Sequence, residues 1–206
     1  PLHLALHAPC CSAATVARLL EADEIRQKAA GIDRGCEKLD GHGNLPLHIA
    51  LRDAAPAEAV AALVAAHPGA CEVTDSRGHF PIHVLLQQQR QYWQSGYAAS
   101  LLGIVKLLLR VSPSSSGYVT RTHGQLPIHV CLANHPLEDG AAETSLQLME
   151  AVLSANLAAI RERDHAGDLP LHIGIRVVGR VALVERLLAA WPGSVHEPTA
   201  TAAAAA

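Results

Sequence analysis

The sequence predicts an all-α solenoid of about five helix-turn-helix repeats, of which the first and last are incomplete or act as caps. Two observations predict it. The motif Pro-Leu/Ile-His-aliphatic recurs five times, with its proline at positions 1, 46, 81, 127 and 170. After each copy, apolar residues fall at i, i+3 and i+4, which places them on one face of a helix. Repeats of this kind bury their apolar faces against neighbouring copies, so they stack into an elongated domain.

Each unit reads as a turn, a short first helix opened by the motif proline, a loop and a second helix. Proline suits the first position of a helix because an N–H there has no helical partner. The apolar triplets that define the second helices are Val16/Leu19/Leu20, Val60/Leu63/Val64, Ile104/Leu107/Leu108, Met149/Val152/Leu153 and Val184/Leu187/Leu188. We expect one domain over residues 1–198, with repeats near 1–39, 40–74, 75–119, 120–163 and 164–198, and a featureless tail at 199–206.

A turn signal, Asp-x-x-Gly, precedes three of the motifs. It begins at Asp40, Asp75 and Asp164. Asp favours the start of a turn and Gly tolerates a positive φ, so these segments predict tight turns between units. The fourth unit keeps Gly124 but has Arg121 where Asp is expected.

These three features in the same register resemble the ankyrin repeat, whose signature is Asp-x-x-Gly-x-Thr-Pro-Leu-His-x-Ala followed by an Ile-Val-x-Leu-Leu helix. The resemblance covers residues 1–195. The chain departs from the family pattern where Thr precedes Pro, because Leu45, Phe80, Leu126 and Leu169 stand there. These side chains lack the hydroxyl that caps the first helix. We expect them to pack against the adjacent unit instead.

The resemblance implies a non-catalytic module or scaffold that binds another protein. It implies that one histidine in each motif hydrogen-bonds backbone near the turn and ties neighbouring units together. These structural histidines are His3, His48, His83, His129 and His172. It also implies contact positions at the turns and the first helices, namely His42, Asn44, Arg52, Arg77, His79, Gln87, Thr122, His123, Gln125, Asn134, His165, Asp168 and Arg176.

The spacing of the motifs predicts insertions. The motif prolines lie 45, 35, 46 and 43 residues apart, against a family period of about 33. The extra residues fall near 87–97 and 135–143, between the two helices of units three and four, and near 24–38, where they predict a lengthened second helix. The first insertion carries Tyr92, Trp93 and Tyr97, which are either partner-binding anchors or a cover over the edge of the solenoid.

Composition narrows the function further. With 16 basic and 19 acidic residues and no basic cluster, the chain lacks the charge pattern of a nucleic-acid binder. Its longest apolar stretch, near 98–111, is too short to cross a bilayer. No motif for catalysis, a cofactor or a metal is present, so we do not expect an enzyme.

The five cysteines are odd in number and include no Cys-x-x-Cys pair, which predicts buried or half-buried free thiols. Free thiols favour a reducing, intracellular compartment, either the cytoplasm or an organelle interior. We expect the partner to be another protein or a multi-subunit complex. The alternative to a recognition module is a constitutive structural or assembly subunit. Such a subunit belongs to a large complex, for example one in an organellar membrane.

Overall fold

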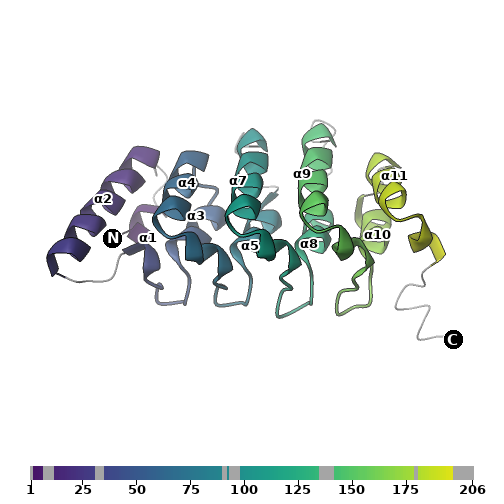
Figure 1. The fold of residues 1–206 in the computed structure, drawn as a ribbon, viewed down its shortest axis with the longest axis horizontal. Coiled ribbons are helices and arrows are strands. Elements are labelled where there is room, and N and C mark those ends of the chain that lie inside the picture. Colours follow the sequence, from purple (N-terminus) through teal and green to yellow (C-terminus); the bar gives the residue numbers. More distant parts are fainter. Residues whose placement is uncertain are drawn as a thin grey trace.

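A computed structural model describes residues 2–6, 12–30, 35–89, 92, 98–134, 142–178 and 181–196 of the chain. Every regular element among these residues is a helix, which confirms the prediction of an all-α chain. The helices form two rows that run side by side along the molecule (Figure 1).

The inner row consists of the short helices that begin at or beside the motif prolines. They are α1 (Leu2–Leu6), α3 (Pro46–Arg52), α5 (Pro81–Gln87), α8 (Pro127–Ala133) and α10 (Pro170–Ile173). The outer row consists of the second helices, α2 (Ala13–Ala30), α4 (Ala57–Ala66), α7 (Ala98–Val111), α9 (Ala142–Ala155) and α11 (Val181–Ala190).

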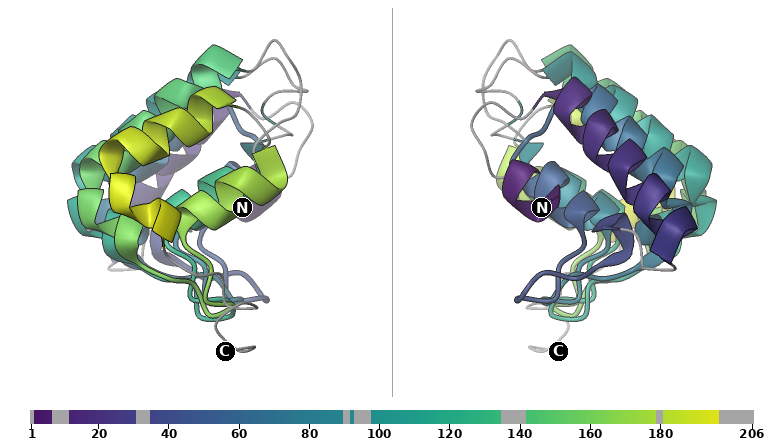
Figure 2. Two further views of the ribbon diagram at one scale, coloured as in Figure 1. Left: turned by 90° about the vertical axis from the view of Figure 1, so that its right-hand side faces the viewer. Right: turned by 90° about the vertical axis from the view of Figure 1, so that its left-hand side faces the viewer.

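Short 3₁₀ helices follow the outer helices, and one π-helical turn follows α10. The 3₁₀ helices are η1 (Gly35–Glu37), η2 (Pro68–Glu72), η3 (Pro113–Gly117), η5 (Leu157–Arg161) and η7 (Pro192–His196), and the π-helical turn is η6 (Gly174–Val178). Each inner helix packs on the outer helix of its own unit and on the inner helix of the next. In the outer row, α2 contacts α4, α4 contacts α7, and α7 contacts α9. Seen along the stack, the turns between units project together to one side (Figure 2).

Apolar residues before the motif prolines hold the start of the inner helices. Leu45, Leu126 and Leu169 have extended backbones that lead into the helix, and their side chains are buried. Phe80 is half-buried and stacks on Tyr118 with ring centroids 4.2 Å apart. These side chains therefore contribute burial where a threonine would contribute a capping hydroxyl.

The apolar triplets lie between the two rows of helices. In unit three the triplet predicted from the sequence is shifted by one residue from its true position. Measured from the end of each outer helix, Ser112 corresponds to His67, because both leave α-helix for a 3₁₀ turn with similar backbone angles. Val60 therefore corresponds to Val105 and not to Ile104. Both Ile104 and Val105 are buried, so the sequence pattern alone did not separate the two registers.

The outer helices differ in length in the way the motif spacing predicts. Helix α2 has 18 residues, α7 and α9 have 14 each, and α4 and α11 have 10 each. The lengthened second helix of unit one is confirmed. In units three and four, part of the inserted sequence extends the outer helix, while residues 90–91, 93–97 and 135–141 lie outside the described residues, as do Cys10, Cys11 and the predicted tail. None of the described helices is both long and apolar enough to span a lipid bilayer.

Candidate partner-binding surface

The turns between units are built around a carboxylate that accepts backbone N–H groups. Asp75 Oδ1 accepts from the N–H of Arg77 at 2.9 Å and of His79 at 2.8 Å. Asp40 and Asp164 repeat this arrangement in their own turns. Because these N–H groups point at the carboxylate, the turns keep their shape without any strand pairing.

Asp40 shows the electrostatic effect of this arrangement. Burial opposes ionisation of its carboxyl, but hydrogen bonds from the backbone and side chain of Asn44 and the backbone of His42 lower its pKa to about 2. Hydrogen bonds within the turn therefore keep this carboxylate ionised.

The turn of unit four corrects the sequence-based interpretation. Its first residue is Thr120, whose backbone N–H donates to the carbonyl of Gln125 at 2.9 Å and whose Oγ1 accepts from the N–H of Gln125 at 3.0 Å. Thr120 thus takes the place of Asp75, and the turn is one residue longer. The extra residue places Arg121 at the tip and not at the position of the turn-forming Asp.

Neighbouring turns contact one another through a tip residue and a glycine. Gly43, Gly78 and Gly124 all have positive φ angles, as does Gly167. A Cβ on Gly78 would lie 2.7 Å from Cβ of Arg121, and a Cβ on Gly124 would lie 2.2 Å from the ring of His165. The glycine therefore supplies both a left-handed backbone and the space that the next turn occupies.

Ten of the thirteen contact residues predicted at the turns and the first helices are exposed or half-exposed on this framework. The exposed ones lie at the turn tips and in η6; they are His42, Arg77, Thr122, His123, His165 and Arg176. Partly exposed ones lie mainly at the ends of the inner helices; they are Arg52, Gln87, Gln125 and Asn134. The tip residue Arg121 is also exposed, and the sequence-based list did not include it.

Three predicted contact residues are buried and have structural roles instead. Asn44 is 3% exposed, and its side chain donates to Asp40 and contacts Ser76 of the next turn. His79 is 8% exposed and lies 3.7 Å from the carboxylate of Asp75. Asp168 is 6% exposed and pairs with Arg176. These positions are corrected from partner contacts to parts of the turn framework.

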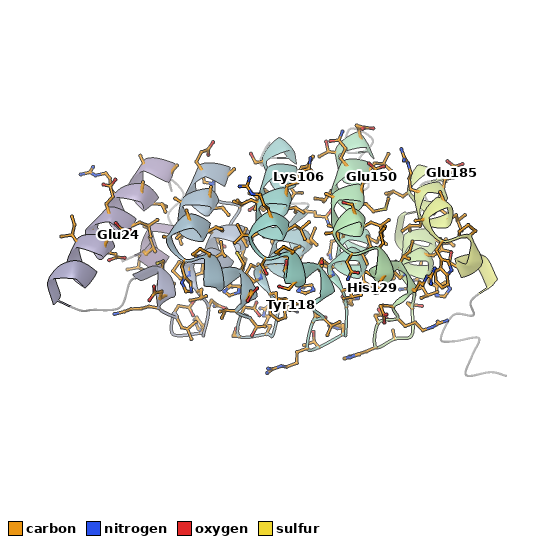
Figure 3. All side chains as sticks on the ribbon, in the orientation of Figure 1. Glu24, Lys106, Tyr118, His129, Glu150 and Glu185 are labelled. Carbon is orange, nitrogen blue, oxygen red and sulfur yellow. The ribbon has the colours of Figure 1, made fainter. Side chains whose placement is uncertain are left out.

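The motif histidines form a hydrogen-bonded ladder between units. His129 Nδ1 accepts the backbone N–H of Leu126 at 3.2 Å, and Nε2 donates to the carbonyl of Glu162 at 3.1 Å. Figure 3 labels His129 at the level where the helices meet the turns. His48 repeats this pattern, bridging Leu45 and Val73. Burial lowers the pKa of both rings, which keeps them neutral and able to accept and donate at once.

At the ends of the stack the ladder continues. His3 Nε2 lies 3.3 Å from the backbone carbonyl of Asn44. His172 Nδ1 accepts the N–H of Leu169 at 3.2 Å. Four of the five motif histidines therefore hydrogen-bond the backbone as the resemblance implied.

His83 is the exception among the motif histidines. Its ring is fully buried, and neither ring nitrogen has a hydrogen-bond partner. Burial, with a smaller contribution from nearby His79, lowers its pKa to about 4, and the carbonyls of Gln125 and Tyr118 oppose this shift without completing a hydrogen bond. The Phe80 ring lies 6.0 Å from the His83 ring, so aromatic packing surrounds this position instead of the ladder.

Two described residues in the insertion of unit three, Gln89 and Tyr92, pack against the neighbouring units. Tyr92 is fully buried, and its hydroxyl donates to the carbonyl of Leu51 in unit two at 3.4 Å. Gln89, also fully buried, donates from Nε2 to the carbonyl of Cys131 in unit four at 3.0 Å. The expectation that Tyr92 is a partner-binding anchor is therefore wrong, because this side chain is part of the cover. Trp93 and Tyr97 lie outside the described residues.

The buried thiols and the serine turn also have structural surroundings. Cys71 and Cys131 are buried free thiols, and burial raises the pKa of Cys71 to about 11 and that of Cys131 to about 12. Ser112 and Ser114 both donate to Glu72, which links η3 to η2. Over the ranges given above, no three His, Cys, Asp or Glu side chains converge as a metal site would require.

No protein-family model matches the chain, and no curated protein matches it.

Proposed function

We propose that the chain is a non-catalytic, ankyrin-like scaffold that binds a partner protein through its turn tips and the ends of its inner helices. The observation that carries the proposal is a difference between the buried and the exposed positions of each turn. Buried positions repeat the same backbone-binding chemistry from unit to unit, whereas the exposed tip residues differ. In chain order the tips are Gly41 and His42; Ser76 and Arg77; Arg121, Thr122 and His123; and His165 and Ala166. A regular frame with varied side chains is what a recognition surface requires.

The chemistry of the buried polar groups supports a binding role over catalysis. The buried carboxylate of Asp164 accepts two backbone N–H groups, and that of Asp168 pairs with Arg176. His48 and His129 are occupied on both ring nitrogens. Side chains held in this way stabilise the turns. The exposed arginines and histidines remain available to a partner, and arginine is common among residues that dominate binding energy.

A paired capture experiment tests the proposal. The full chain and the variant Arg77→Glu/His123→Glu are used as baits in crude extract. The control is Arg18→Glu/Ala65→Glu, at exposed positions of the outer row, which changes the net charge by the same amount. We expect at least one protein to be captured by the wild type and the control and to be depleted about tenfold or more by the tip variant. Equal capture by all three baits contradicts the proposal.

A native size measurement then separates a transient binder from a permanent subunit. A transient binder elutes largely at the mass of the chain alone, whereas a constitutive subunit elutes only with its complex.

A further inference from the structure

Two adjoining hollows lie along the seam between units three and four. The first, of about 300 Å³, lies between the exposed faces of α7 and α9 and is lined in part by Lys106, Leu109, Arg110 and Ser154. The second, of about 250 Å³, lies beside η3, η5 and the turn of unit four and is lined in part by Val119, Asn156, Ala158, Glu162 and Arg163. Ala155 lines the first hollow and Asn156 the second, so the two meet at consecutive residues.

Departures from the repeat pattern create this seam. The outer helices on either side are the two that the insertions extend to 14 residues. The turn beside the second hollow is the one that is a residue longer and carries Thr120. Leu157 begins η5 where Pro68, Pro113 and Pro192 begin the equivalent 3₁₀ helices, and it is 65% exposed. Val119, on the wall of the second hollow, is 52% exposed.

The charge at the first hollow has one sign. Lys106 and Arg110 are exposed and stand one helical turn apart on α7. Helix α9 has two exposed acids, and both have other partners: Glu150 pairs with Arg186 of α11 at 3.1 Å, and Glu143 accepts a hydrogen bond from Gln147. Figure 3 labels Lys106 and Glu150 on neighbouring outer helices. Neither cation forms an ion pair with another described residue.

The size of the hollows favours a peptide over a small molecule. Each is at or below the lower end of the range of about 300–1,000 Å³ that is usual for small-molecule pockets. Such spaces suit single side chains presented by one chain segment. Lys106 and Arg110 are the charged residues that line the first hollow, so it calls for carboxylates, whereas Glu162 and Arg163 give the second hollow one charge of each sign. Beside these charges, Val119 and Ala158 offer the second hollow's aliphatic surface to an aliphatic side chain.

We propose that this seam is a second docking surface, on the side of the outer helices, which takes an acidic segment of a partner protein. Its carboxylates bind Lys106 and Arg110, and an aliphatic side chain enters the hollow beside Val119. This surface is separate from the turn tips and the ends of the inner helices, so it goes beyond the function proposed above. The scaffold then bridges two partners at once.

Selection from a displayed library of random dodecapeptides against the full chain tests the second surface. We expect enrichment of peptides that combine two or more Asp or Glu residues with Leu, Ile or Val. Synthetic copies of these peptides should lose about tenfold or more in affinity for the variant Lys106→Glu/Arg110→Glu, measured by fluorescence anisotropy. The variant Ala158→Phe, which fills the second hollow from an exposed position, should lose a similar amount.

The matched control is Ala61→Glu/Ala65→Glu, which places the same new side chains at the equivalent exposed positions of α4. It should leave peptide affinity unchanged, and the melting temperatures of all three variants should match that of the wild type. Absence of acidic-aliphatic peptides from the selection, or equal binding to the seam variants, overturns the proposal. Peptides that lose affinity only for Arg77→Glu/His123→Glu overturn the second surface while supporting the first.

Discussion

The junction between units two and three and the junction between units three and four use the same fold with different chemistry. At the first junction, His48 joins the N–H of Leu45 to the carbonyl of Val73, and the turn carboxylate of Asp75 accepts two N–H groups. The tip residue Ser76 lies against Gly43 with room to spare, at 3.8 Å from a Cβ placed there.

At the second junction each of these features is altered. His83 has no hydrogen-bond partner, a threonine hydroxyl replaces the turn carboxylate, and the tip residue Arg121 packs tightly on Gly78. The stacked rings of Phe80 and Tyr118 lie where the ladder is interrupted. Apolar packing therefore sustains the stack even where the hydrogen-bonded ladder fails, because burial is the larger contribution.

The largest difference between the two junctions should appear in Gly78→Ala and Gly43→Ala. Both positions have nearly the same positive φ, 78° and 79°. The backbone strain is therefore shared and costs about 1–2 kcal/mol. Only Gly78→Ala also places a Cβ 2.7 Å from Cβ of Arg121, which adds about 1–3 kcal/mol of overpacking.

Urea denaturation of the two variants measures this difference. Equal losses of unfolding free energy would show that the tip of the fourth turn moves aside at no cost. Gly103→Ala, where a Cβ meets nothing within 4 Å, serves as the control for the alanine side chain itself.

Acid should destabilise the protein mainly through the second junction. Above pH 6.5 His83 is neutral in both the folded and the unfolded chain. As the pH falls from 6.5 towards 4, the unfolded chain takes up a proton that the folded chain excludes. A pKa lowered from 6.5 to about 4 corresponds to a loss of about 3 kcal/mol of unfolding free energy over this window.

The variant His83→Leu isolates that contribution. Its unfolding free energy should fall less steeply with acid than that of the wild type, with the remaining slope due to His48, His79 and His129, whose pKa values burial also lowers. Identical pH profiles for wild type and variant, measured by chemical denaturation at several pH values, would contradict the buried neutral state of His83.

At neutral pH the same histidine should be almost dispensable, unlike its counterpart in the next unit. His129→Leu leaves a buried N–H and a buried carbonyl without partners, which should cost about 2–3 kcal/mol. His83→Leu breaks no hydrogen bond and should cost less than about 1 kcal/mol. Thermal unfolding of both variants with and without EDTA checks this, and a drop in melting temperature caused by EDTA would instead indicate a bound metal.

The smallest difference should lie in the turns themselves. Asp75→Ala removes the acceptor of two backbone N–H groups and should cost about 2 kcal/mol, whereas Thr120→Ala removes the acceptor of one and should cost about 1 kcal/mol. Denaturation midpoints distinguish the two. If Thr120→Ala costs as much as Asp75→Ala, its hydroxyl contributes more than a single acceptor.

Sequence periodicity predicted the order of the helices because burial repeats at a fixed spacing. Two details escaped it for physical reasons. Helix α7 carries Ile104 and Val105 side by side, both buried, so a one-residue shift of register keeps an apolar face. In the turn of unit four the acceptor is the hydroxyl of Thr120, which lies one residue before the position where Asp is expected. The Asp-x-x-Gly motif therefore does not predict this turn.

The candidate binding surface was less predictable than the fold. Asn44, His79 and Asp168 lie at turn positions that are polar in every unit, and polarity alone does not separate a side chain that faces solvent from one that faces a backbone amide. Tyr92 lies in an insertion that the repeat does not require, yet it is buried against unit two. Neither outcome follows from spacing, since the first depends on hydrogen bonds and ion pairs within each unit and the second on a contact between units.

Each tip residue contacts the glycine of the preceding turn. This contact determines which segments can be exchanged between repeats without loss of folding. Arg121 belongs to one turn and Gly78 to the one before it, so a graft that begins at a turn brings together a tip and a glycine that were never selected for each other. A graft whose borders fall in the middle of outer helices transfers the pair intact. Recombination within α4 and α7 should therefore yield folded chimaeras more often than recombination at the turns, although the turns are the exposed connections.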